Sequence, residues 1–357
     1  MGDNGENRGP IRVIGLMSGT SLDGLDIALC SYERVNGKWS YKIDKTACVE
    51  YDSLWKNKLI TAYSTPISVL EDLNLEYGRW LGKRVNDFLK NEAKPLLICS
   101  HGHTIHHNPA KGITYQLGSG SSISKITGIT TIFDFRSKDV SLGGQGAPLV
   151  PIGDQLLFSE YDACLNLGGF SNISFKQFGD RIAFDICPVN IILNDLSERL
   201  GKPFDENGAM ARSGNSNKEL LTSLLRTTKS KTERPSLSRE WVEKNIDPVL
   251  SNSKLPIANQ MNTLVEFMAV NMGRSIQENQ LKTVLVTGGG TYNSFLMERL
   301  SAHAGIEMKM ADNQLINYKE ALTFGFLGVL RWYGLTNVLK SVTGASSDSV
   351  SGEIASV

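Results

Sequence analysis

Two carboxylates stand where a general acid or base is often found. Asp185 lies at the end of the apolar run Ile-Ala-Phe-Asp-Ile, so its side chain can project from a rigid strand end, as a catalytic group must. Glu320 begins a mostly apolar segment with helical spacing. Simpler explanations remain open: Asp185 can cap the turn leading to Pro188, and Glu320 can stabilise a helix N-terminus through the helix dipole.

Two glycine-rich connections between apolar runs form a second kind of candidate site. They lie in VIGLMSGTSLDGLDIALC, residues 13–30, and in ACLNLGGFSNISFKQF, residues 163–178. Turns of Gly, Ser, Thr and Asn direct backbone N–H groups and small hydroxyls toward one point, as a phosphate chain requires. Two ordinary hairpin turns would give the same pattern. Their position at the start of two halves of similar length, however, indicates an internal duplication and favours phosphate binding.

The named nucleotide-binding signatures are missing from the sequence. It contains no GxxxxGK[ST], and GSGSSI fails GxGxxG because Ile123 replaces the third glycine. A run of three glycines, Gly288, Gly289 and Gly290, follows the apolar segment TVLVT and precedes a predicted helix. Such a run lets a ligand lie flat against the backbone beside a helix N-terminus, which suits adenosine. It suits a permissive strand-to-helix turn equally well.

Four of the five histidines occur in SHGHTIHH, at His101, His103, His106 and His107. The dinuclear hydrolase motif HxHxDH would place an Asp where Ile105 stands, and the only other histidine is His303. A metal site is therefore disfavoured. Because imidazoles at strand ends often meet sugar hydroxyls, we expect a substrate-contacting or hydrogen-bonded loop here.

The segment DFRSKDVSLGGQGAPLVP, residues 134–151, combines charged residues with a loop of unusual backbone. Arg136 has the chemistry to hold an anionic group, and a structural pair with Asp134 or Asp139 is an equal alternative. The Gly and Pro residues that follow, on both sides of Gln145, predict a loop of fixed shape.

Composition excludes several classes of partner. The chain of 357 residues carries 37 basic and 37 acidic residues, so its formal net charge is zero. Nucleic-acid binding normally needs a basic surplus, and membrane-surface binding needs a basic cluster or basic amphipathic helix. Five scattered cysteines without CxxC spacing indicate free thiols in a reducing compartment. With no apolar run near the length of a membrane span and no signal-peptide pattern at the start, we expect a cytoplasmic protein.

The apolar periodicity predicts a mixed α/β protein of about two domains. Strands are expected at 11–16, 26–32, 96–99, 129–133, 162–167, 173–178, 182–186 and 283–287. Helices are expected within 54–92 and at 191–200, 261–278, 292–302 and 319–333. The polar stretch 227–238 predicts a surface excursion, and the Ser-rich end after Ser346 predicts a frayed tail.

Nine segments together resemble one family, the anhydro-N-acetylmuramic acid kinases. The most specific are GLMSGTSLDGLDIAL, DFRSKDVSLGGQGAPLVP, LNLGGFSNIS, VTGGGTYNSFLMERL and KEALTFGFLGVL, and the likeness spans nearly the whole chain. The resemblance implies a two-domain actin-like (ribonuclease H-like) ATPase fold, with ATP and sugar in the cleft between the domains. The implied domains are residues 11–130 and 131–357, with the last helix and tail able to pack back on the first domain. The resemblance does not decide the oligomeric state, and a homodimer is one possibility.

The resemblance also assigns site residues. It implies a first phosphate loop made of Ser18, Gly19, Thr20, Ser21, Leu22, Asp23, Gly24 and Asp26, and a second made of Gly168, Gly169, Ser171 and Asn172. Gly288, Gly289 and Gly290 would lie at the adenosine. His101, His103, Arg136, Gln145 and Asn190 would contact the sugar or its lactyl carboxylate.

The reaction implied by the resemblance couples hydrolysis to phosphorylation. In 1,6-anhydro-N-acetylmuramic acid, O6 bridges back to C1. Asp185 would activate a water that opens this bond at C1, and the released O6 would take the γ-phosphoryl group of ATP, as in cell-wall recycling. Glu320 would assist the water. Mg²⁺ would arrive with ATP, with Asp23 near it, and no separate protein metal site is implied.

The resemblance is weakest around the predicted base. The family's segment DTGPGN reads DICPVN here, so Cys187 and Val189 replace glycines, and SHGHT replaces SHGQT. A β-branched residue adopts positive φ only under strain, so the backbone at Val189 is expected to run differently and the sugar pocket to be narrower. A kinase for another sugar and a nucleotide-binding paralogue with weak or no activity remain the alternatives.

Overall fold

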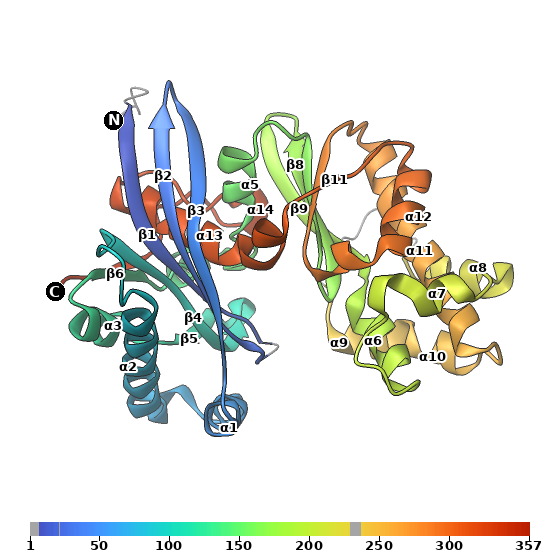
Figure 1. The fold of residues 1–357 in the computed structure, drawn as a ribbon, viewed down its shortest axis with the longest axis horizontal. Helices are drawn as coiled ribbons and strands as arrows, with labels where there is room; N and C mark the ends of the chain where they lie inside the picture. The colour runs from blue at the N-terminus through green and yellow to red at the C-terminus, as the bar shows by residue number, and fades with distance from the viewer. Residues whose placement is uncertain (1–6, 21, 229–236) are drawn as a thin grey trace. The chain divides into compact units, whose positions relative to one another are not determined.

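The structure, a computed structural model, describes residues 7–20, 22–228 and 237–357. This part of the chain contains two β-sheets with helices packed against them, which confirms the expected α/β class (Figure 1). The chain divides into two compact units. Unit 1 comprises Met1–Phe158 and Tyr318–Val357, and unit 2 comprises Ser159–Asn317.

Unit 1 is built on a seven-stranded sheet in the order β12-β6-β4-β1-β2-β3, with β5 paired to β4. Its strands are β1 Arg8–Ser18, β2 Gly24–Val35, β3 Lys38–Glu50, β4 Leu97–Asn108, β5 Ile113–Leu117, β6 Thr130–Phe133 and β12 Glu353–Ala355. Its helices are α1 Ser53–Ala62, α2 Glu71–Phe88, α3 Gly120–Thr127, α4 Ser137–Ser141, α5 Pro151–Leu157, α14 Lys340–Thr343 and most of α13 Asn313–Trp332, with short 3₁₀ turns at Ile67–Val69 and Pro109–Lys111.

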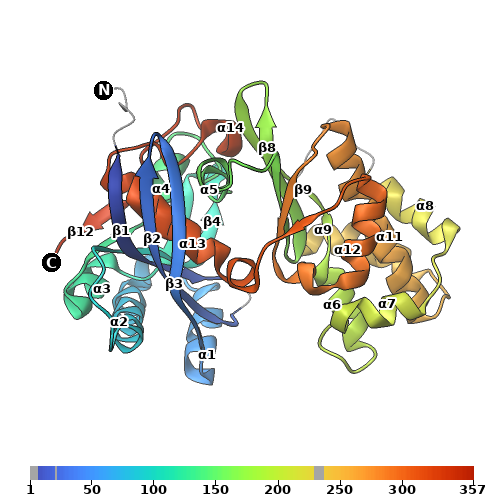
Figure 2. The same cartoon turned by 45° about the horizontal axis from the view of Figure 1, so that its top comes forward.

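Alternate residues of the central strand β1 face opposite sides of this sheet, as strand geometry requires. Ile14 and Leu16 belong to a buried cluster with residues of α1, α2 and α3. On the other side, α13 lies so close to β1 that a Cβ on Gly15 would stand 1.8 Å from the carbonyl oxygen of Ala321. Figures 1 and 2 show α13 running across the sheet. Both faces of the strand that leads to Ser18 are therefore fixed by packing.

Unit 2 is built on a five-stranded sheet in the order β11-β10-β7-β8-β9. Its strands are β7 Ala163–Leu167, β8 Phe170–Gln177, β9 Asp180–Pro188, β10 Val284–Thr287 and β11 Lys309–Met310. Its helices are α6 Asn190–Glu198, α7 Ala209–Ser213, α8 Lys218–Thr227, α9 Arg239–Asn245, α10 Asp247–Ser251, α11 Ile257–Glu278 and α12 Ser294–Ala304, with 3₁₀ turns at Glu206–Gly208 and Gly289–Tyr292. One buried cluster joins the sheet to α6, α11 and α12.

The two sheets share one topology. In each, three consecutive strands pair antiparallel (β1–β2–β3 and β7–β8–β9), and two later strands add in parallel beside the first (β4 and β6, β10 and β11). The order 3-2-1-4-5 in both is that of the ribonuclease H-like fold, from which actin-like proteins are built twice. The duplication predicted from the two glycine turns is present in the strand order.

The division of the chain differs from the expected boundary between residues 130 and 131, because residues 131–158 group with unit 1. Residues 318–357 also group with unit 1, in agreement with a last helix and tail that pack back on the first domain. The physical reasons are that β12 pairs antiparallel with β6 and that α13 packs on β1. The tail expected to fray after Ser346 is instead ordered, because Ser349 and Ser351 are buried and Ser351 N–H donates to Asn337 at 2.7 Å.

Three other local expectations need correction or limits. The histidine segment expected as a loop is part of the long strand β4, because β5 pairs with its second half. The helical span 54–92 is two helices, separated by a 3₁₀ turn after Pro66. The strands β3, β5, β11 and β12 were missed. Most of the predicted excursion at 227–238 lies outside the described residues.

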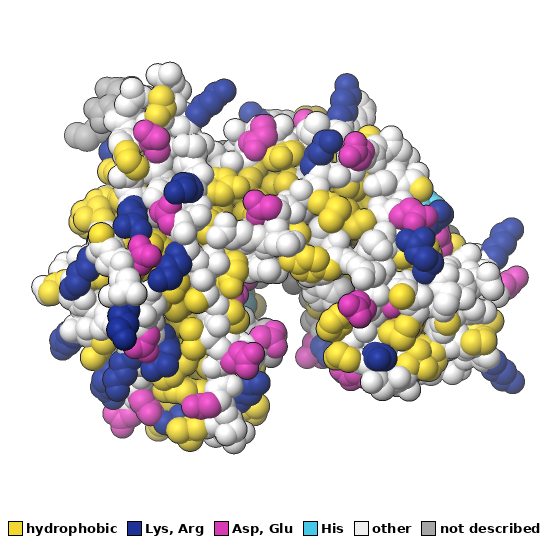
Figure 3. All heavy atoms as spheres, viewed as in Figure 1, with side chains coloured by type: hydrophobic (Ala, Val, Ile, Leu, Met, Phe, Trp, Pro, Cys, Tyr) yellow, Lys and Arg dark blue, Asp and Glu magenta, His cyan; other side chains and the backbone are white. Residues whose placement is uncertain are grey.

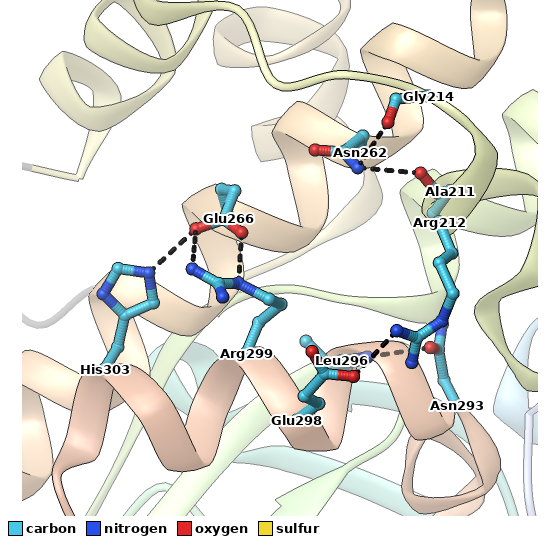
Figure 4. Close-up of polar contacts among 10 residues, drawn as sticks. All are labelled: Ala211, Arg212, Gly214, Asn262, Glu266, Asn293, Leu296, Glu298, Arg299 and His303. Carbon is cyan, nitrogen blue, oxygen red and sulfur yellow. Dashed lines mark hydrogen bonds and ion pairs between the residues drawn. The ribbon is translucent and has the colours of Figure 1, made fainter.

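Helix α12, which follows the three glycines, is tied to α11 by polar contacts (Figure 4). Glu266 of α11 accepts from Arg299 and, at 2.8 Å, pairs with His303 Nε2, both on α12. Glu298, which precedes Arg299 on α12, pairs with Arg212 of α7 at 2.8 Å. The helix therefore holds the glycine turn at its start in a fixed position within unit 2.

Charges of both signs are interspersed on the face drawn in Figure 3, in keeping with the net charge of zero. This face carries no continuous basic area of the kind that binds a phosphate backbone. Among the described residues, no helix is both long enough and apolar enough to cross a membrane.

Candidate active site

The first glycine turn joins β1 to β2 in unit 1. Leu22 N–H donates to the carbonyl oxygen of Gly19 at 3.3 Å, and Leu22 has φ 60°, which is uncommon for a residue with a branched side chain. Asp23 is exposed, whereas Asp26 on β2 is partly buried. Ser21, predicted in this loop, lies outside the described residues. The turn is tight, and such strained backbone is frequent at functional sites.

Ser18, the last residue of β1, is buried in a network of side chains. Its Oγ lies 2.7 Å from the Tyr51 hydroxyl and 2.7 Å from His103 Nδ1. His103 Nε2 lies 2.9 Å from the Tyr63 hydroxyl, and Tyr51 and Tyr77 share a hydrogen bond. Burial lowers the pKa of His103 to about 4, so its imidazole is neutral at physiological pH. The hydrogen bond with His103 therefore orients the Ser18 hydroxyl at the start of the turn.

His101 and Arg136 form a buried pair beside this network. Arg136 donates to His101 Nε2 from Nη2 at 2.8 Å and from Nε at 3.1 Å. Because Nε2 accepts, the ring proton is on Nδ1, which donates to the carbonyl oxygen of Gly102 at 3.0 Å. Burial and then the Arg136 charge hold the pKa of His101 well below its usual range. The expected pairing of Arg136 with an aspartate is not what the structure has; its partners are His101 and the carbonyl oxygen of Gly146.

The glycine-rich loop after Arg136 folds around Asp139, which is fully buried. The Asp139 carboxylate accepts from Gly146 N–H at 2.7 Å and from the Thr343 hydroxyl at 2.7 Å. Gln145 N–H donates to the carbonyl oxygen of Thr343 at 2.8 Å, and the Gln145 side chain is exposed. Asp139 is therefore a structural anchor that fixes the shape of the loop carrying Gln145.

Two carboxyl groups of unit 1 have raised pKa values. Burial, followed by repulsion from Asp23, raises the pKa of Asp26 against a hydrogen bond with Cys48 that lowers it. Desolvation by the surrounding protein raises the pKa of the Glu320 carboxyl, and the Arg136 charge lowers it. Glu320 as a whole residue is exposed. Raised carboxyl pKa values of this kind are common at catalytic sites.

The second glycine turn, Gly168–Gly169, leads from β7 into β8 and contacts the start of α6. The first N–H groups of that helix donate to this turn: Asn190 N–H to Gly168 O at 3.2 Å and Ile191 N–H to Gly169 O at 3.3 Å. Ser171 is buried, accepts from Cys187 N–H at 3.2 Å and donates to Cys187 O at 3.0 Å. Its hydroxyl therefore serves strand pairing, while the neighbouring Asn172 is exposed.

The three-glycine turn lies against the second glycine turn within unit 2. Gly288 has φ 85°, and a Cβ there would stand 2.7 Å from Asn166 Oδ1 and from Leu167 O. The Asn190 side chain donates to Leu167 O at 3.4 Å and lies 3.5 Å from the position of a Cβ on Gly290. The side chain of Asn190 thus joins the turn predicted for phosphate to the turn predicted for adenosine.

Asp185 lies on β9 beside a β-bulge. Asn172 pairs with Asp185 and Ser171 with Cys187, so Ile186 is the extra residue of the bulged strand. The Asp185 carboxylate accepts from Leu237 N–H at 2.9 Å. Burial raises its pKa, and the hydrogen bond from Leu237 opposes that rise. The result is a half-buried carboxyl on a rigid strand, held by one backbone donor.

Cys187 and Val189, which replace the family's two glycines, do not strain the backbone in the way expected. Val189 has φ −127° and not a positive value, so it carries no left-handed strain. Both Cys187 and Val189 are fully buried in the hydrophobic core of unit 2. Both side chains therefore belong to the core, and the expected narrowing of the sugar pocket stays a prediction.

The structure also contains site residues that the sequence analysis missed. The hydroxyls of Tyr51, Tyr63 and Tyr77 belong to the Ser18 network, and Leu237 holds Asp185. No motif marks them, because each is brought in from a distant part of the sequence. Among the described residues, no group of three or more His, Cys, Asp or Glu side chains is placed to hold a metal ion.

Comparison with known proteins identifies the family. A model of anhydro-N-acetylmuramic acid kinase matches residues 11–356 of the chain. The chain belongs to this family. Its relatives include the anhydro-N-acetylmuramic acid kinases of Pseudomonas fluorescens strain Pf0-1, at 34% identity over 96% of this chain and 98% of that protein, and of Mannheimia succiniciproducens, at 33% identity over the same shares.

Membership of the anhydro-N-acetylmuramic acid kinase family confirms the resemblance drawn from the motifs and makes the protein a kinase, a phosphotransferase with an alcohol acceptor. The two alternatives, a kinase for another sugar and a nucleotide-binding paralogue with weak or no activity, are not favoured by these matches. Among solved structures, the chain is similar to a glucokinase of the ROK family from Streptomyces griseus in complex with glucose and AMPPNP, with 10% identity, a TM-score of 0.41 and coverage of 88% of this chain and 98% of that one.

Proposed function

We propose that this kinase opens 1,6-anhydro-N-acetylmuramic acid with water and phosphorylates the released O6. The C1–O6 bond breaks as the water oxygen bonds to C1, and O6 takes the γ-phosphoryl group of ATP, leaving ADP. The products are N-acetylmuramic acid 6-phosphate and ADP. The observation that carries the proposal is a half-buried carboxyl, Asp185, on a bulged strand and held by Leu237 N–H, in a chain of this family.

Asp185 is the proposed general base. A base of this kind needs a fixed position and a pKa nearer the working pH than that of a free carboxyl. The bulged strand and the donor Leu237 supply the first, and burial supplies the second. Glu320, whose pKa is also raised, is the proposed second carboxylate that assists the water.

The glycine turns are the proposed phosphate and adenosine contacts. The first turn offers Ser18, Gly19, Thr20, Leu22 and Gly24, and the second offers Gly168, Gly169 and Asn172, with Ser171 supporting it from the sheet. The three glycines at 288–290 leave the backbone bare for the adenosine. Asn190 fixes the two unit 2 turns against each other.

Mg²⁺ is the proposed companion of ATP, and the residues present fit it. Asp23 is exposed and Asp26 lies close enough for Asp23 to affect its pKa, which gives two carboxylates at the first turn. Mg²⁺ is usually held by one or two carboxylates together with the substrate's phosphates. When bound, it would neutralise phosphate charge during transfer.

The sugar is proposed to contact His101, Arg136 and the loop with Gln145, with His103 acting through Ser18. Both ring nitrogens of His101 are already engaged, Nε2 by Arg136 and Nδ1 by the carbonyl oxygen of Gly102, so His101 would position Arg136, and Arg136 would carry the positive charge for the lactyl carboxylate. A cytoplasmic location is proposed because ATP is the phosphoryl donor and all five cysteines are free thiols.

A panel of substrates tests the proposal. The purified protein with ATP and Mg²⁺ is offered 1,6-anhydro-N-acetylmuramic acid, N-acetylmuramic acid, N-acetylglucosamine and glucose, and ADP release is followed. We expect ADP only with the anhydro sugar, and a product with phosphate on O6 and a free hydroxyl on C1 in its NMR spectrum. ADP release with an ordinary sugar at equal or greater efficiency would contradict the proposal.

A further inference from the structure

Unit 1 contains a pocket beside His101 that none of the assigned roles uses. Its volume is about 140 Å³. That is similar to a cavity of about 150 Å³ known to take a benzene molecule, so the pocket has room for one small group and not for a whole amino sugar. Because His101 is also the partner of Arg136, the pocket opens next to the proposed sugar contacts.

The lining of the pocket is polar and comes from four segments. Strand β4 provides Ser100 and His101, β5 and the turn after it provide Gln116 and Ser119, and the residues after β6 provide Asp134 and Ser137. Helix α2 adds Asn74. The Phe133 ring adds an apolar wall. Hydroxyls, an amide and a carboxylate around one aromatic surface are the groups that recognise a small polar ligand with a methyl or ring face.

Asp134 is held in this lining by a strained backbone. It has φ 50°, and its Oδ1 accepts from Ser137 N–H at 3.1 Å, which fixes the side chain at the end of β6. Left-handed residues other than glycine are kept where the surrounding structure demands a particular side-chain direction. The fold thus presents one carboxylate to the pocket at a conformational cost.

Gln116 has a defined orientation as well. Its Nε2 donates to Thr114 Oγ1 at 2.9 Å and more weakly to Thr104 Oγ1 at 3.5 Å. With the amide nitrogen committed, its carbonyl oxygen remains as an acceptor; among the described residues no hydrogen bond reaches it. Gln116 and Asp134 therefore both offer acceptors to a ligand that brings an N–H donor.

The charge of the lining decides which substituent of the substrate fits. No Lys or Arg lines the pocket, and Arg136, which donates to His101 and to the carbonyl oxygen of Gly146, is not among the lining residues. A carboxylate arm in this pocket would meet Asp134 without a compensating cation. An acetamido group is neutral, brings one N–H donor and one carbonyl acceptor, and ends in a methyl.

We infer that this pocket binds the 2-acetamido group of the substrate, and that Asp134 and Gln116 determine specificity for it. The acetamido N–H donates to the acceptors of Asp134 and Gln116, its carbonyl oxygen accepts from the hydroxyls of Ser119 or Ser137, and its methyl packs on Phe133. The inference rests on the proposed function, since it names the part of the amino sugar that this side of the site recognises.

Two variants and three substrates test it. Gln116→Leu keeps the size of the side chain and removes its acceptor, and Asp134→Asn removes the charge while keeping a residue that tolerates positive φ. Asp72→Asn, on the exposed start of α2, is the matched control. The substrates are 1,6-anhydro-N-acetylmuramic acid, its analogue without the lactyl group, and its analogue with a hydroxyl in place of the acetamido group. Thermal unfolding of each variant verifies that it is folded.

With both acetamido substrates, we expect Gln116→Leu to raise KM by roughly 5- to 10-fold, the effect of one hydrogen bond. Asp134→Asn keeps an acceptor but loses the charge that strengthens the hydrogen bond, so it should raise KM by roughly 2- to 5-fold. In both variants kcat should change little. With the hydroxyl analogue the variants should match the control. If the pocket held the lactyl carboxylate instead, Asp134→Asn would lower KM, and only when the lactyl group is present. That result, or variants indistinguishable from Asp72→Asn with every substrate, overturns the inference. Wild-type protein inactive with all three substrates overturns the proposed function and the inference together.

Discussion

Replacing Asp185 by asparagine tests the centre of the proposed mechanism with little structural disturbance. Asparagine has the same shape, and its side-chain oxygen can still accept the hydrogen bond from Leu237 N–H that the Asp185 carboxylate accepts. What it loses is the ability to take a proton from water. The change also removes a partly buried charge whose pKa burial has raised, so folding should not suffer.

The magnitude follows from the role of the group. A positioned general base contributes roughly 10²- to 10⁴-fold to a rate, which corresponds to about 3–5 kcal/mol of barrier. We therefore expect kcat of Asp185→Asn to fall by that factor. ATP affinity should stay within about twofold, because among the described residues no hydrogen bond joins the Asp185 side chain to the glycine turns at 168–169 and 288–290.

The pH dependence of the rate provides a second, independent test of Asp185 as the base. The base works as a carboxylate, and burial raises its pKa above the ordinary value of 3.8. Activity of the wild type should therefore be full above the raised pKa and should fall as the pH drops through it. Asp185→Asn has no such group, so its residual rate should lack this acid limb.

The assay measures ADP release against pH, with ATP binding by calorimetry. Asp180→Asn is the matched control, because Asp180 lies on the same strand and is exposed. Turnover of Asp185→Asn within tenfold of the wild type, or an unchanged acid limb, would refute the assignment of Asp185 as the base. A loss of ATP affinity equal to the loss of kcat would instead make Asp185 a nucleotide-binding residue.

Three further changes probe the framework around the site. Lys319 and Asp154 are paired at 2.7 Å, with side chains 7% and 6% exposed. Asp154→Asn should therefore lower the free energy of unfolding, measured by chemical denaturation, by about 3–5 kcal/mol. As the control, Asp87→Asn breaks the exposed pair with Arg84 and should lower it by less than about 1 kcal/mol. Equal effects would contradict the buried-pair argument. His103→Gln should keep ATP KM near the wild-type value, because glutamine also donates and accepts. His103→Leu should raise it and lose about 1–3 kcal/mol of stability, because the Ser18 and Tyr63 hydroxyls lose their hydrogen bonds to the ring and Ser18 keeps only the one with Tyr51. Identical kinetics for the two variants would remove His103 from that network. Cys187→Gly should lower stability by about 2 kcal/mol without changing the ranking of substrates, and a changed ranking would place Cys187 at the sugar.

The parts of the fold that the sequence predicted well are those with strong local patterns. Apolar runs bounded by glycine gave the strands on either side of both turns, and the likeness of the two turns anticipated the repeated strand order. The missed strand β3 lies at an edge of its sheet, and its alternation is blurred by charged residues on a half-exposed surface. Edge strands often carry such charges, which hide them from a periodicity argument.

The parts of the site that could not be predicted depend on contacts between distant residues. Arg136 meets His101 across 35 positions, and Leu237 meets Asp185 across 52. Neither pairing has a local signature, because any backbone N–H or buried histidine offers the same chemistry. The aspartate of the 134–151 segment that proved structural, Asp139, differs from Asp134 only in what the folded loop places around it.

The β-bulge explains how the predicted base keeps its surroundings while the neighbouring residues change. On a regular strand, Asp185 and Cys187 would point to the same face, and a cysteine in place of glycine would crowd the site. Here Ile186 is the extra residue, so Asp185 and Cys187 pair with the adjacent residues Asn172 and Ser171 of β8, whose side chains point to opposite faces. Cys187 therefore enters the core while Asp185 stays half-exposed. Substitutions on the core side of this bulge can accumulate without altering the carboxylate, which is why the departure from DTGPGN is compatible with kinase activity.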